Sequence, residues 1–212
     1  MMLRVVIFAM VLALLVLVVA VSLDSKPKSV PTPTVLVSSE SPDQNAEILL
    51  NRTPLPKPLI SPRLVIHKRD RLLSVYSETE EIRTFPIGLG PRPYGPKRHE
   101  HDGRTPEGSY YVCSKNPNSK YYLALGISYP NAEDAALGLQ NRLISRRQYE
   151  QIIQAIASQS CPPWDTALGG AIVIHGRGAS ADWTLGCVGL EDGDMRVLFD
   201  AIPVGTPIII EP

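Results

Sequence analysis

The amino-terminal segment contains an uninterrupted apolar run, and this run limits what the chain can become more than any other feature. Residues 5–21 are 17 apolar residues in a row, without Gly or Pro, and Arg4 is the only charge in residues 1–23. A helix that spans a bilayer needs about 20 apolar residues (range about 17–25), whereas a cleavable signal has an apolar core of about 7–15. We therefore expect residues 1–23 to enter a membrane, and their length favours an uncleaved anchor.

Two alternatives stay open for this segment. It is a cleavable signal if Val18-Val19-Ala20 or Ala20-Val21-Ser22 is a cleavage site, or a buried helix at the extreme terminus. Arg4, on the short side of the run, predicts a cytoplasmic amino terminus and export of the remainder. The expected location is extracytoplasmic, on the periplasmic or cell-wall side, with residues 5–23 as an inner-membrane anchor.

Composition divides the rest of the chain into a linker and one domain. Residues 24–62 carry eight prolines among many Ser and Thr residues, a pattern typical of an extended spacer. Residues 63–212 have the length of one domain. The 21 basic and 21 acidic residues balance to a net charge of zero, which argues against a nucleic-acid binder.

Residue patterns in the domain predict a mixed α and β fold that is rich in strands. A capping box at Ser145–Gln148, followed by apolar residues at helical spacing to Ile156, predicts one helix. The spacing of Met195, Leu198, Phe199 and Ile202 predicts a second helix, with Asp192 and Asp194 as candidate caps. The strand candidates are 63–67 and 71–76 (a hairpin), 81–87, 109–113, 121–125, 171–175 and 206–210.

Export changes the interpretation of the three cysteines, Cys113, Cys161 and Cys187. In an oxidising compartment two thiols can pair and one is left over. If a disulfide forms, we expect it to join Cys113 and Cys161. The alternative is that both are buried and reduced.

The third cysteine belongs to the stretch in which chemistry-bearing residues are densest. An apolar strand ends in His175-Gly176, and Thr184-Leu185-Gly186-Cys187 follows after a short loop rich in Gly and polar residues. A nucleophilic cysteine needs a base, room for a carbonyl and donors for the oxyanion. A loop of this length can return Cys187 to His175, and the N–H groups of Gly186 and Cys187 are candidate oxyanion donors. The alternative is a purely structural role, in which a buried cysteine lies beside a hydrogen-bonded core histidine.

These residues, in this order, resemble the signature of the L,D-transpeptidase (YkuD) catalytic domain: His-Gly, a variable stretch, then Ser or Thr, one residue, Gly-Cys and an apolar residue. Several other stretches are similar to the YafK-like branch of that family: 85–90, 102–110, 115–117, 125–130 and 205–208. The resemblance covers roughly residues 63–212. It implies a β-rich, sandwich- or barrel-like catalytic domain with a few helices.

The resemblance also implies an activity and its participants. Family members act on peptidoglycan stem peptides: a cysteine attacks the bond after the L-centre of diaminopimelate and releases the terminal D-alanine. The acyl group then passes to an amine of another stem, of a lipoprotein lysine or of a free D-amino acid, whereas water gives hydrolysis. No metal or organic cofactor is implied.

When the motif is matched position by position, the resemblance implies that Cys187 is the nucleophile and that His175 is its base. Gly176 orients the base, and Gly186 and Thr184 shape the oxyanion site. We also expect substrate contacts from Arg104, Tyr129, Trp183 and Arg177. One departure is Gly189, which stands where many members have Arg, two residues after the cysteine.

Two other function classes stay open. A metal hydrolase would need His99, His101 and His175 to converge, although the first two fall in a loop. A non-catalytic peptidoglycan-binding module would keep the fold without turnover. Basic residues between Arg92 and Arg104 could form a cationic rim for an anionic peptide, or a solvated loop balanced by Glu100 and Asp102.

Overall fold

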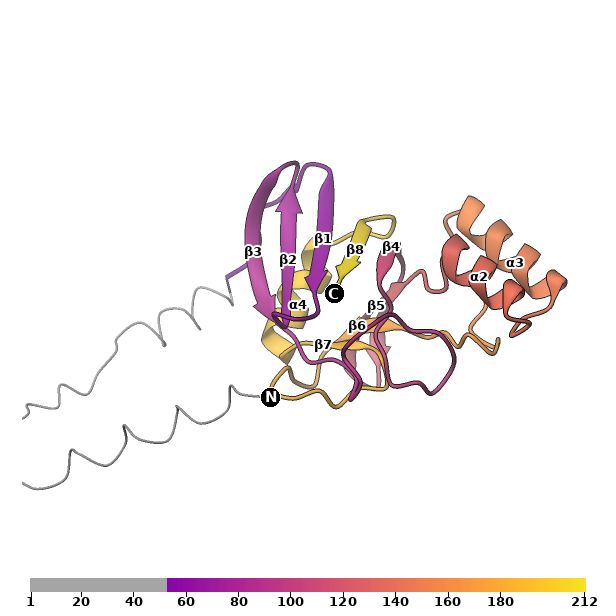
Figure 1. Ribbon diagram of the computed structural model, residues 1–212. Helices are drawn as coiled ribbons and strands as arrows, with labels where there is room; N and C mark the ends of the chain where they lie inside the picture. Colours follow the sequence, from indigo (N-terminus) through magenta and orange to yellow (C-terminus); the bar gives the residue numbers. More distant parts are fainter. Residues whose placement is uncertain (1–52) are drawn as a thin grey trace, which may run out of the picture. The chain divides into compact units, whose positions relative to one another are not determined.

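The computed structural model describes residues 53–212, which form eight strands and three helices (Figure 1). The strands are β1 (Pro62–His67), β2 (Leu72–Ser77), β3 (Glu80–Pro86), β4 (Gly108–Ser119), β5 (Tyr122–Ile127), β6 (Val173–His175), β7 (Val188–Gly189) and β8 (Pro207–Glu211). The helices are α2 (Ala132–Gln140), α3 (Arg146–Ala157) and α4 (Asp192–Ala201). The anchor assigned to residues 1–23 and residues 24–52 of the assigned linker lie outside the described residues.

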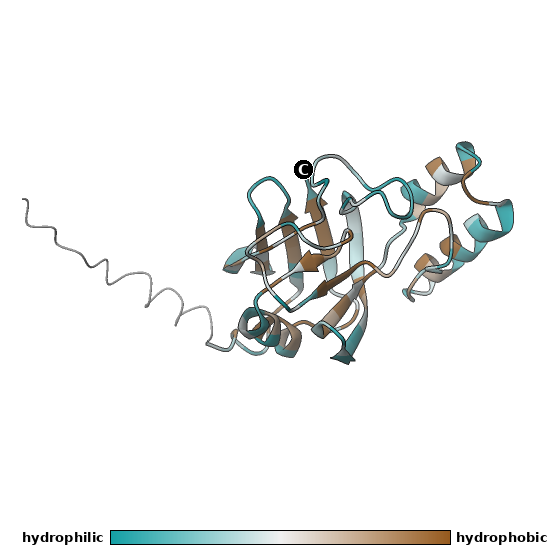
Figure 2. Cartoon of the chain, turned by 90° about the horizontal axis from the view of Figure 1, so that it is seen from below, coloured by the Kyte–Doolittle hydropathy of each residue, from teal (hydrophilic) through white to brown (hydrophobic). Residues whose placement is uncertain are grey.

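All eight strands belong to one curled sheet with the order β3-β2-β1-β8-β4-β5-β6-β7. Most neighbours are antiparallel, but β8 lies parallel to β1 and β7 lies parallel to β6. The prediction of a β-rich mixed domain with a barrel-like sheet is confirmed, and Figure 2 shows the curl of the sheet from below. The predicted hairpin at 63–76 is β1 and β2, which pair from Pro62 with Ser77 to His67 with Leu72.

One apolar core extends from the sheet onto α4. β1 and β2 each bury three consecutive residues, which requires cover on both faces of the sheet. Met195 and Leu198 of α4 are fully buried in the same apolar cluster. Leu55, within the range that the sequence assigns to the linker, is 3% exposed and belongs to this cluster. The domain core therefore begins before β1.

Two elements were not expected from the sequence, and one expected cap is wrong. Helix α2 begins with a capping box between Asn131 and Asp134, but it is short and contains Gly138, so its apolar periodicity is weak. Strand β7 has only two residues. At α4 the cap residue is Glu191, without a capping hydrogen bond, because the Glu191 and Asp192 carboxylates instead accept N–H groups of the loop after His175.

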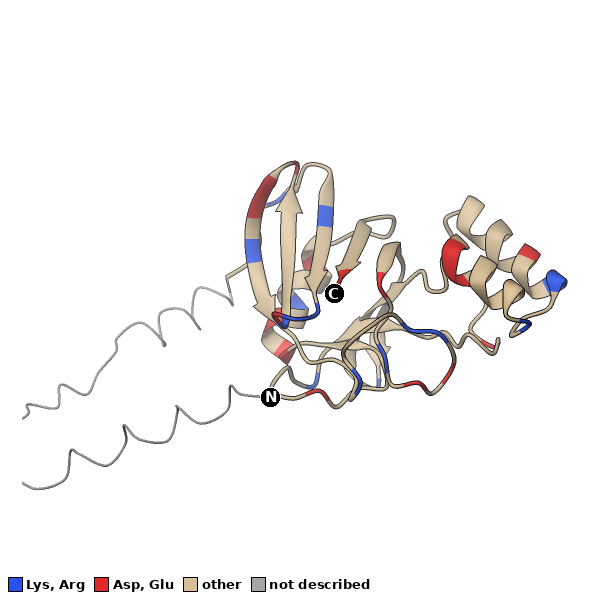
Figure 3. Ribbon diagram, in the orientation of Figure 1, with Lys and Arg blue, Asp and Glu red and all other residues tan. Residues whose placement is uncertain are grey.

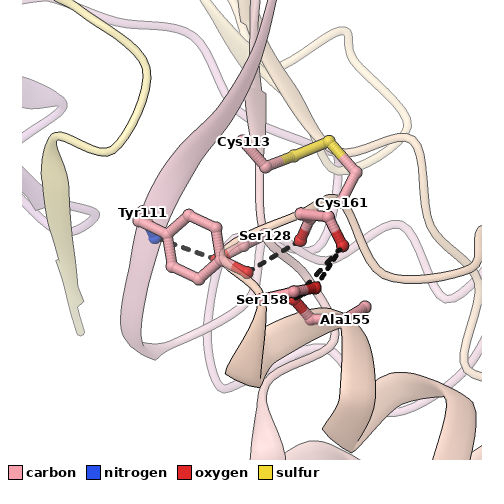
Figure 4. Close-up of a disulfide and its surroundings, with 7 residues drawn as sticks. Tyr111, Cys113, Ser128, Ala155, Ser158 and Cys161 are labelled. Atoms are coloured by element: carbon pink, nitrogen blue, oxygen red, sulfur yellow. Dashed lines mark hydrogen bonds between the residues drawn. A yellow bond between two sulfur atoms is a disulfide. The ribbon is translucent and has the colours of Figure 1, made fainter.

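Helices α2 and α3 form a separate layer with its own small apolar cluster, visible in Figure 2 as brown faces turned toward each other. A disulfide between Cys113 in β4 and Cys161, just beyond α3, joins this layer to the sheet (Figure 4). Beside it, the Tyr111 hydroxyl donates to the Ser160 carbonyl at 2.7 Å. Of the two alternatives for these cysteines, the structure has the disulfide.

Between residues 53 and 212, no helix combines the length and the apolar character needed to cross a bilayer. The apolar run at residues 5–21 lies outside that range.

Removing the disulfide is expected to lower stability strongly. The two cysteines are 48 residues apart in sequence, and closing a loop of that length lowers the entropy of the unfolded chain, an effect worth about 2–4 kcal/mol. The Cys113→Ala/Cys161→Ala double variant should therefore unfold at a lower urea concentration than the wild type. Wild type treated with reductant should match the variant; equal midpoints for the oxidised wild type and the double variant would contradict the prediction.

Candidate active site

The parallel pairing of β6 with β7 brings His175 and Cys187 together. Residues 176–187 connect the two strands, and the register sets Ile174 opposite Val188 and His175 opposite Gly189. Cys187, immediately before β7, therefore lies beside Val173, two residues before His175. Residues two apart in a strand share a face, and both side chains line one cavity of about 330 Å³.

The imidazole of His175 is held by one hydrogen bond and two aromatic rings. Its Nδ1 lies 2.6 Å from the Gly176 carbonyl oxygen, which can only accept, so Nδ1 carries the proton and Nε2 keeps its lone pair. The Tyr121 ring stacks on the imidazole at 4.6 Å between centroids, and Trp183 meets it edge-on at 5.4 Å. Burial lowers the pKa of His175 below its ordinary value, although the bond to Gly176 works in the opposite direction.

The thiol of Cys187 is half-buried and is the one free thiol among residues 53–212. Burial raises its pKa, and an N–H from Val173 and the charges of Lys97 and Lys120 oppose that rise. The S–H donates to the Ala171 carbonyl oxygen at 3.6 Å. A raised thiol pKa beside a lowered imidazole pKa keeps both groups neutral at pH 7.

The turn before the thiol is fixed by Thr184 and Gly186. The buried Thr184 hydroxyl donates to the Cys187 carbonyl at 2.7 Å and accepts the Gly186 N–H at 3.2 Å. That N–H is therefore occupied, whereas no acceptor for the Cys187 N–H is found within residues 53–212. Gly186 has φ +124°, and a Cβ there would come within 2.4 Å of the Arg104 carbonyl oxygen, so the backbones meet only because this residue is glycine.

The loop between β3 and β4, residues 87–107, forms another wall of the cavity. Asp102 organises it: this buried carboxylate accepts the N–H groups of Arg98, His99 and Arg104 and pairs with the Lys97 ammonium at 2.9 Å. Burial raises the pKa of Asp102, but these bonds outweigh burial and the pKa is lowered overall. Both basic and acidic residues occur along the loop (Figure 3). Lys97 is buried, so it is not part of a free cationic rim.

The turn between β1 and β2 holds both loops of the site. Lys68 is 1% exposed and donates to the Gly95 and Thr105 carbonyls and to Glu107, all in or at the 87–107 loop. Arg71 forms a bidentate ion pair with Asp182, the residue before Trp183. The Arg71 bond lowers the pKa of Asp182, whose carboxylate also accepts the Leu89 N–H at 2.9 Å.

The four expected substrate-contact residues occupy different places. Trp183 lines the cavity and is 41% exposed. Tyr129 is fully buried, and its hydroxyl donates to the Leu168 carbonyl, so its side chain faces the core and not the cavity. Arg104 donates to the Tyr94 carbonyl at 2.8 Å, and Arg177 is exposed; neither is among the residues that line the cavity.

Two cavity residues were not expected there, namely Lys120 and Tyr121 in the turn between β4 and β5. The pairing of β5 with β6 sets Ala124 opposite His175, which places this turn beside the imidazole. The sequence places Tyr121 at the start of an expected strand. No local pattern shows that the pairing of β5 with β6 brings it to His175.

Within the part of the chain that the structure describes, no group of three or more His, Cys, Asp or Glu residues could hold a metal ion. His99 bonds through Nδ1 to the Glu100 carbonyl, and the His101 side chain is 83% exposed.

Comparisons with known proteins agree on one family. Residues 61–210 match YkuD, described as the L,D-transpeptidase catalytic domain. The Escherichia coli (strain K12) protein named "Putative L,D-transpeptidase YafK" is 33% identical over 85 residues, which are 37% of this chain and 35% of that protein. The match thus spans about a third of that relative's length.

One solved structure with a TM-score above 0.5 supports the fold. A mutant of the helical cell shape determining protein Pgp2 from Campylobacter jejuni superposes with a TM-score of 0.51 at 22% identity, over 71% of this chain and 46% of that one. An L,D-transpeptidase from Mycobacterium smegmatis gives a TM-score of 0.43 at 15% identity, over 72% and 59% of the two chains. Because the family match covers most of the chain and includes the His175 and Cys187 region, this protein belongs to the L,D-transpeptidase catalytic-domain (YkuD) family.

Proposed function

We propose that this protein is a cysteine L,D-transpeptidase that acts on peptidoglycan stem peptides. Family and fold support transpeptidase-type chemistry. The observation that carries the proposal to particular residues is the shared cavity of Cys187 and His175, in which the imidazole has its Nδ1 proton fixed by Gly176 and a free lone pair on Nε2. A thiol nucleophile and its base must lie close together, and the shared cavity supports this assignment.

The reaction starts from a neutral pair. Cys187 Sγ attacks the carbonyl after the L-centre of diaminopimelate while His175 Nε2 takes the thiol proton, and the Cys187 N–H donates to the oxyanion. The Gly176 carbonyl and the stacked Tyr121 ring stabilise the imidazolium as it forms. The imidazolium then gives its proton to the departing D-alanine nitrogen, which leaves an acyl-enzyme on Cys187.

The fate of the acyl-enzyme depends on the acceptor. An amine from a second stem, a lipoprotein lysine or a free D-amino acid gives transfer, whereas water gives hydrolysis of the same bond. Every step up to the acyl-enzyme is common to both, so the geometry of Cys187 and His175 supports either outcome. Transfer is the proposal that follows from the family, and hydrolysis is its alternative.

We also propose that the domain works outside the cytoplasm, tethered by residues 5–23. Peptidoglycan lies on that side of the membrane. The Cys113–Cys161 disulfide supports this location, because such bonds persist in oxidising compartments and are rare in the cytosol.

Loss of the thiol is expected to end turnover. The Cys187→Ala chain, incubated with a disaccharide tetrapeptide, should release no D-alanine by mass spectrometry, whereas wild type should release it and transfer the acyl group to an added amine. Iodoacetamide should inactivate the wild type, and EDTA should not. Turnover by Cys187→Ala would remove Cys187 as nucleophile, and wild type that binds the muropeptide without any mass change would favour a non-catalytic binding module.

The pH dependence should reveal a neutral resting pair. Because the pKa of His175 is lowered from 6.5, kcat/KM should fall only below pH 6.5, as the base becomes protonated. Because the pKa of Cys187 is raised from 9.0, alkylation by iodoacetamide, which needs the thiolate, should still be rising above pH 9.

Removing the base supplies the matched control for that profile. His175→Ala should lower kcat by about 10²–10⁴-fold and should remove the fall in kcat/KM at low pH. An unfolding midpoint close to that of the wild type, measured by circular dichroism, would show that the variant still folds. An alkylation rate that reaches its plateau near neutral pH in wild type would mean a preformed thiolate–imidazolium pair and would contradict the neutral one.

A further inference from the structure

The cations around the cavity differ in whether their charge is already matched. Lys97 is 3% exposed and pairs with Asp102 at 2.9 Å, so its charge is neutralised within the loop. His101 lies 3.8 Å from Glu100 and carries a charge only when protonated. Neither residue offers a permanent, unmatched positive charge to a ligand.

Lys120 does offer a permanent positive charge that no carboxylate of the described chain neutralises. Its side chain is exposed on the cavity wall, and no carboxylate partner for it is found among residues 53–212. Its ammonium lies 4.9 Å from the centroid of the Tyr121 ring, the same ring that stacks on His175. This cation–π contact favours an ammonium position close to the base without consuming its charge.

The loop that carries the thiol cannot supply such a charge. Gly189, two residues after Cys187, has no side chain, and a Cβ there would come within 2.7 Å of the Gly178 carbonyl oxygen. Arg177, the nearest cation in that loop, is not among the cavity-lining residues. The turn between β4 and β5 therefore provides the unmatched positive charge of the site.

We propose that Lys120 is a specificity-determining residue that binds a carboxylate of the donor stem peptide. The inference rests on the proposed function, in which the donor carries carboxylates near the scissile bond. Two of them have the right chemistry: the terminal D-alanine carboxylate and the free carboxylate on the diaminopimelate side chain. A contact made equally in the ground state and the transition state changes KM and leaves kcat almost unchanged.

The first test needs no turnover. Iodoacetate and iodoacetamide both alkylate the Cys187 thiolate with loss of iodide, but only iodoacetate carries a carboxylate, so the ratio of their rate constants cancels any change in thiol pKa. Lys120→Gln should lower that ratio by about threefold to fivefold, the size of a screened contact between exposed charges. Lys120→Arg should retain it, and the difference should shrink at high salt.

The matched control removes an equal charge elsewhere. Lys57 lines a separate hollow beside the start of β1, so Lys57→Gln should leave the ratio at the wild-type value. An unchanged ratio in Lys120→Gln, or an equal fall in Lys57→Gln, would overturn the proposal.

The second test identifies the carboxylate. The full chain is assayed with tetrapeptide donors that are unmodified, amidated on the diaminopimelate side chain, or amidated at the terminal D-alanine. Lys120→Gln should raise KM for the unmodified donor by about fivefold, and should have no effect on the donor whose amidation removes the partner carboxylate. An equal rise for all three donors would overturn the proposal. If wild type turned over none of them, the proposed function would fail, and the alkylation ratio would still decide whether Lys120 selects anions.

Discussion

Two cations in one hairpin turn hold the candidate site together. Lys68 binds the 87–107 loop through two carbonyls and Glu107, and Arg71 binds the 176–187 loop through Asp182. Both loops lack regular structure over most of their length, so such bonds set their positions. A buried ammonium without partners would be costly, and burial does lower the pKa of Lys68. The three acceptors around it offset that cost and make the turn a fixed support.

The same loops control the electrostatics of the thiol and the imidazole. They remove both groups from water, which disfavours the charged form of each. Aromatic rings from two different elements complete that enclosure, Tyr121 from the turn between β4 and β5 and Trp183 from the 176–187 loop. The imidazole is thus oriented by a backbone carbonyl and by packing. No carboxylate bonded to its Nδ1 is found in residues 53–212.

Local patterns were enough to predict seven of the eight strands, two of the three helices and the family. Alternation and capping boxes depend on near neighbours, and the motif around His175 and Cys187 is compact in sequence. The missing parts depend on distant partners: Arg71 reaches Asp182 across 111 residues, and Tyr121 reaches His175 through the pairing of β5 with β6. Tyr129 illustrates the opposite error, since a tyrosine suited to a groove by its chemistry is fully buried. Residue type shows what a side chain could do, and strand register decides where it does so.

The hydrogen bond from the Cys187 S–H to the Ala171 carbonyl has a consequence for the lifetime of the protein. Peroxides and foreign disulfides react with thiolates far faster than with thiols. A thiol that stays protonated is therefore a poor target for oxidative damage. Where no reductase is present, the low reactivity of the protonated Cys187 thiol would keep it reduced, although the same domain contains the Cys113–Cys161 disulfide.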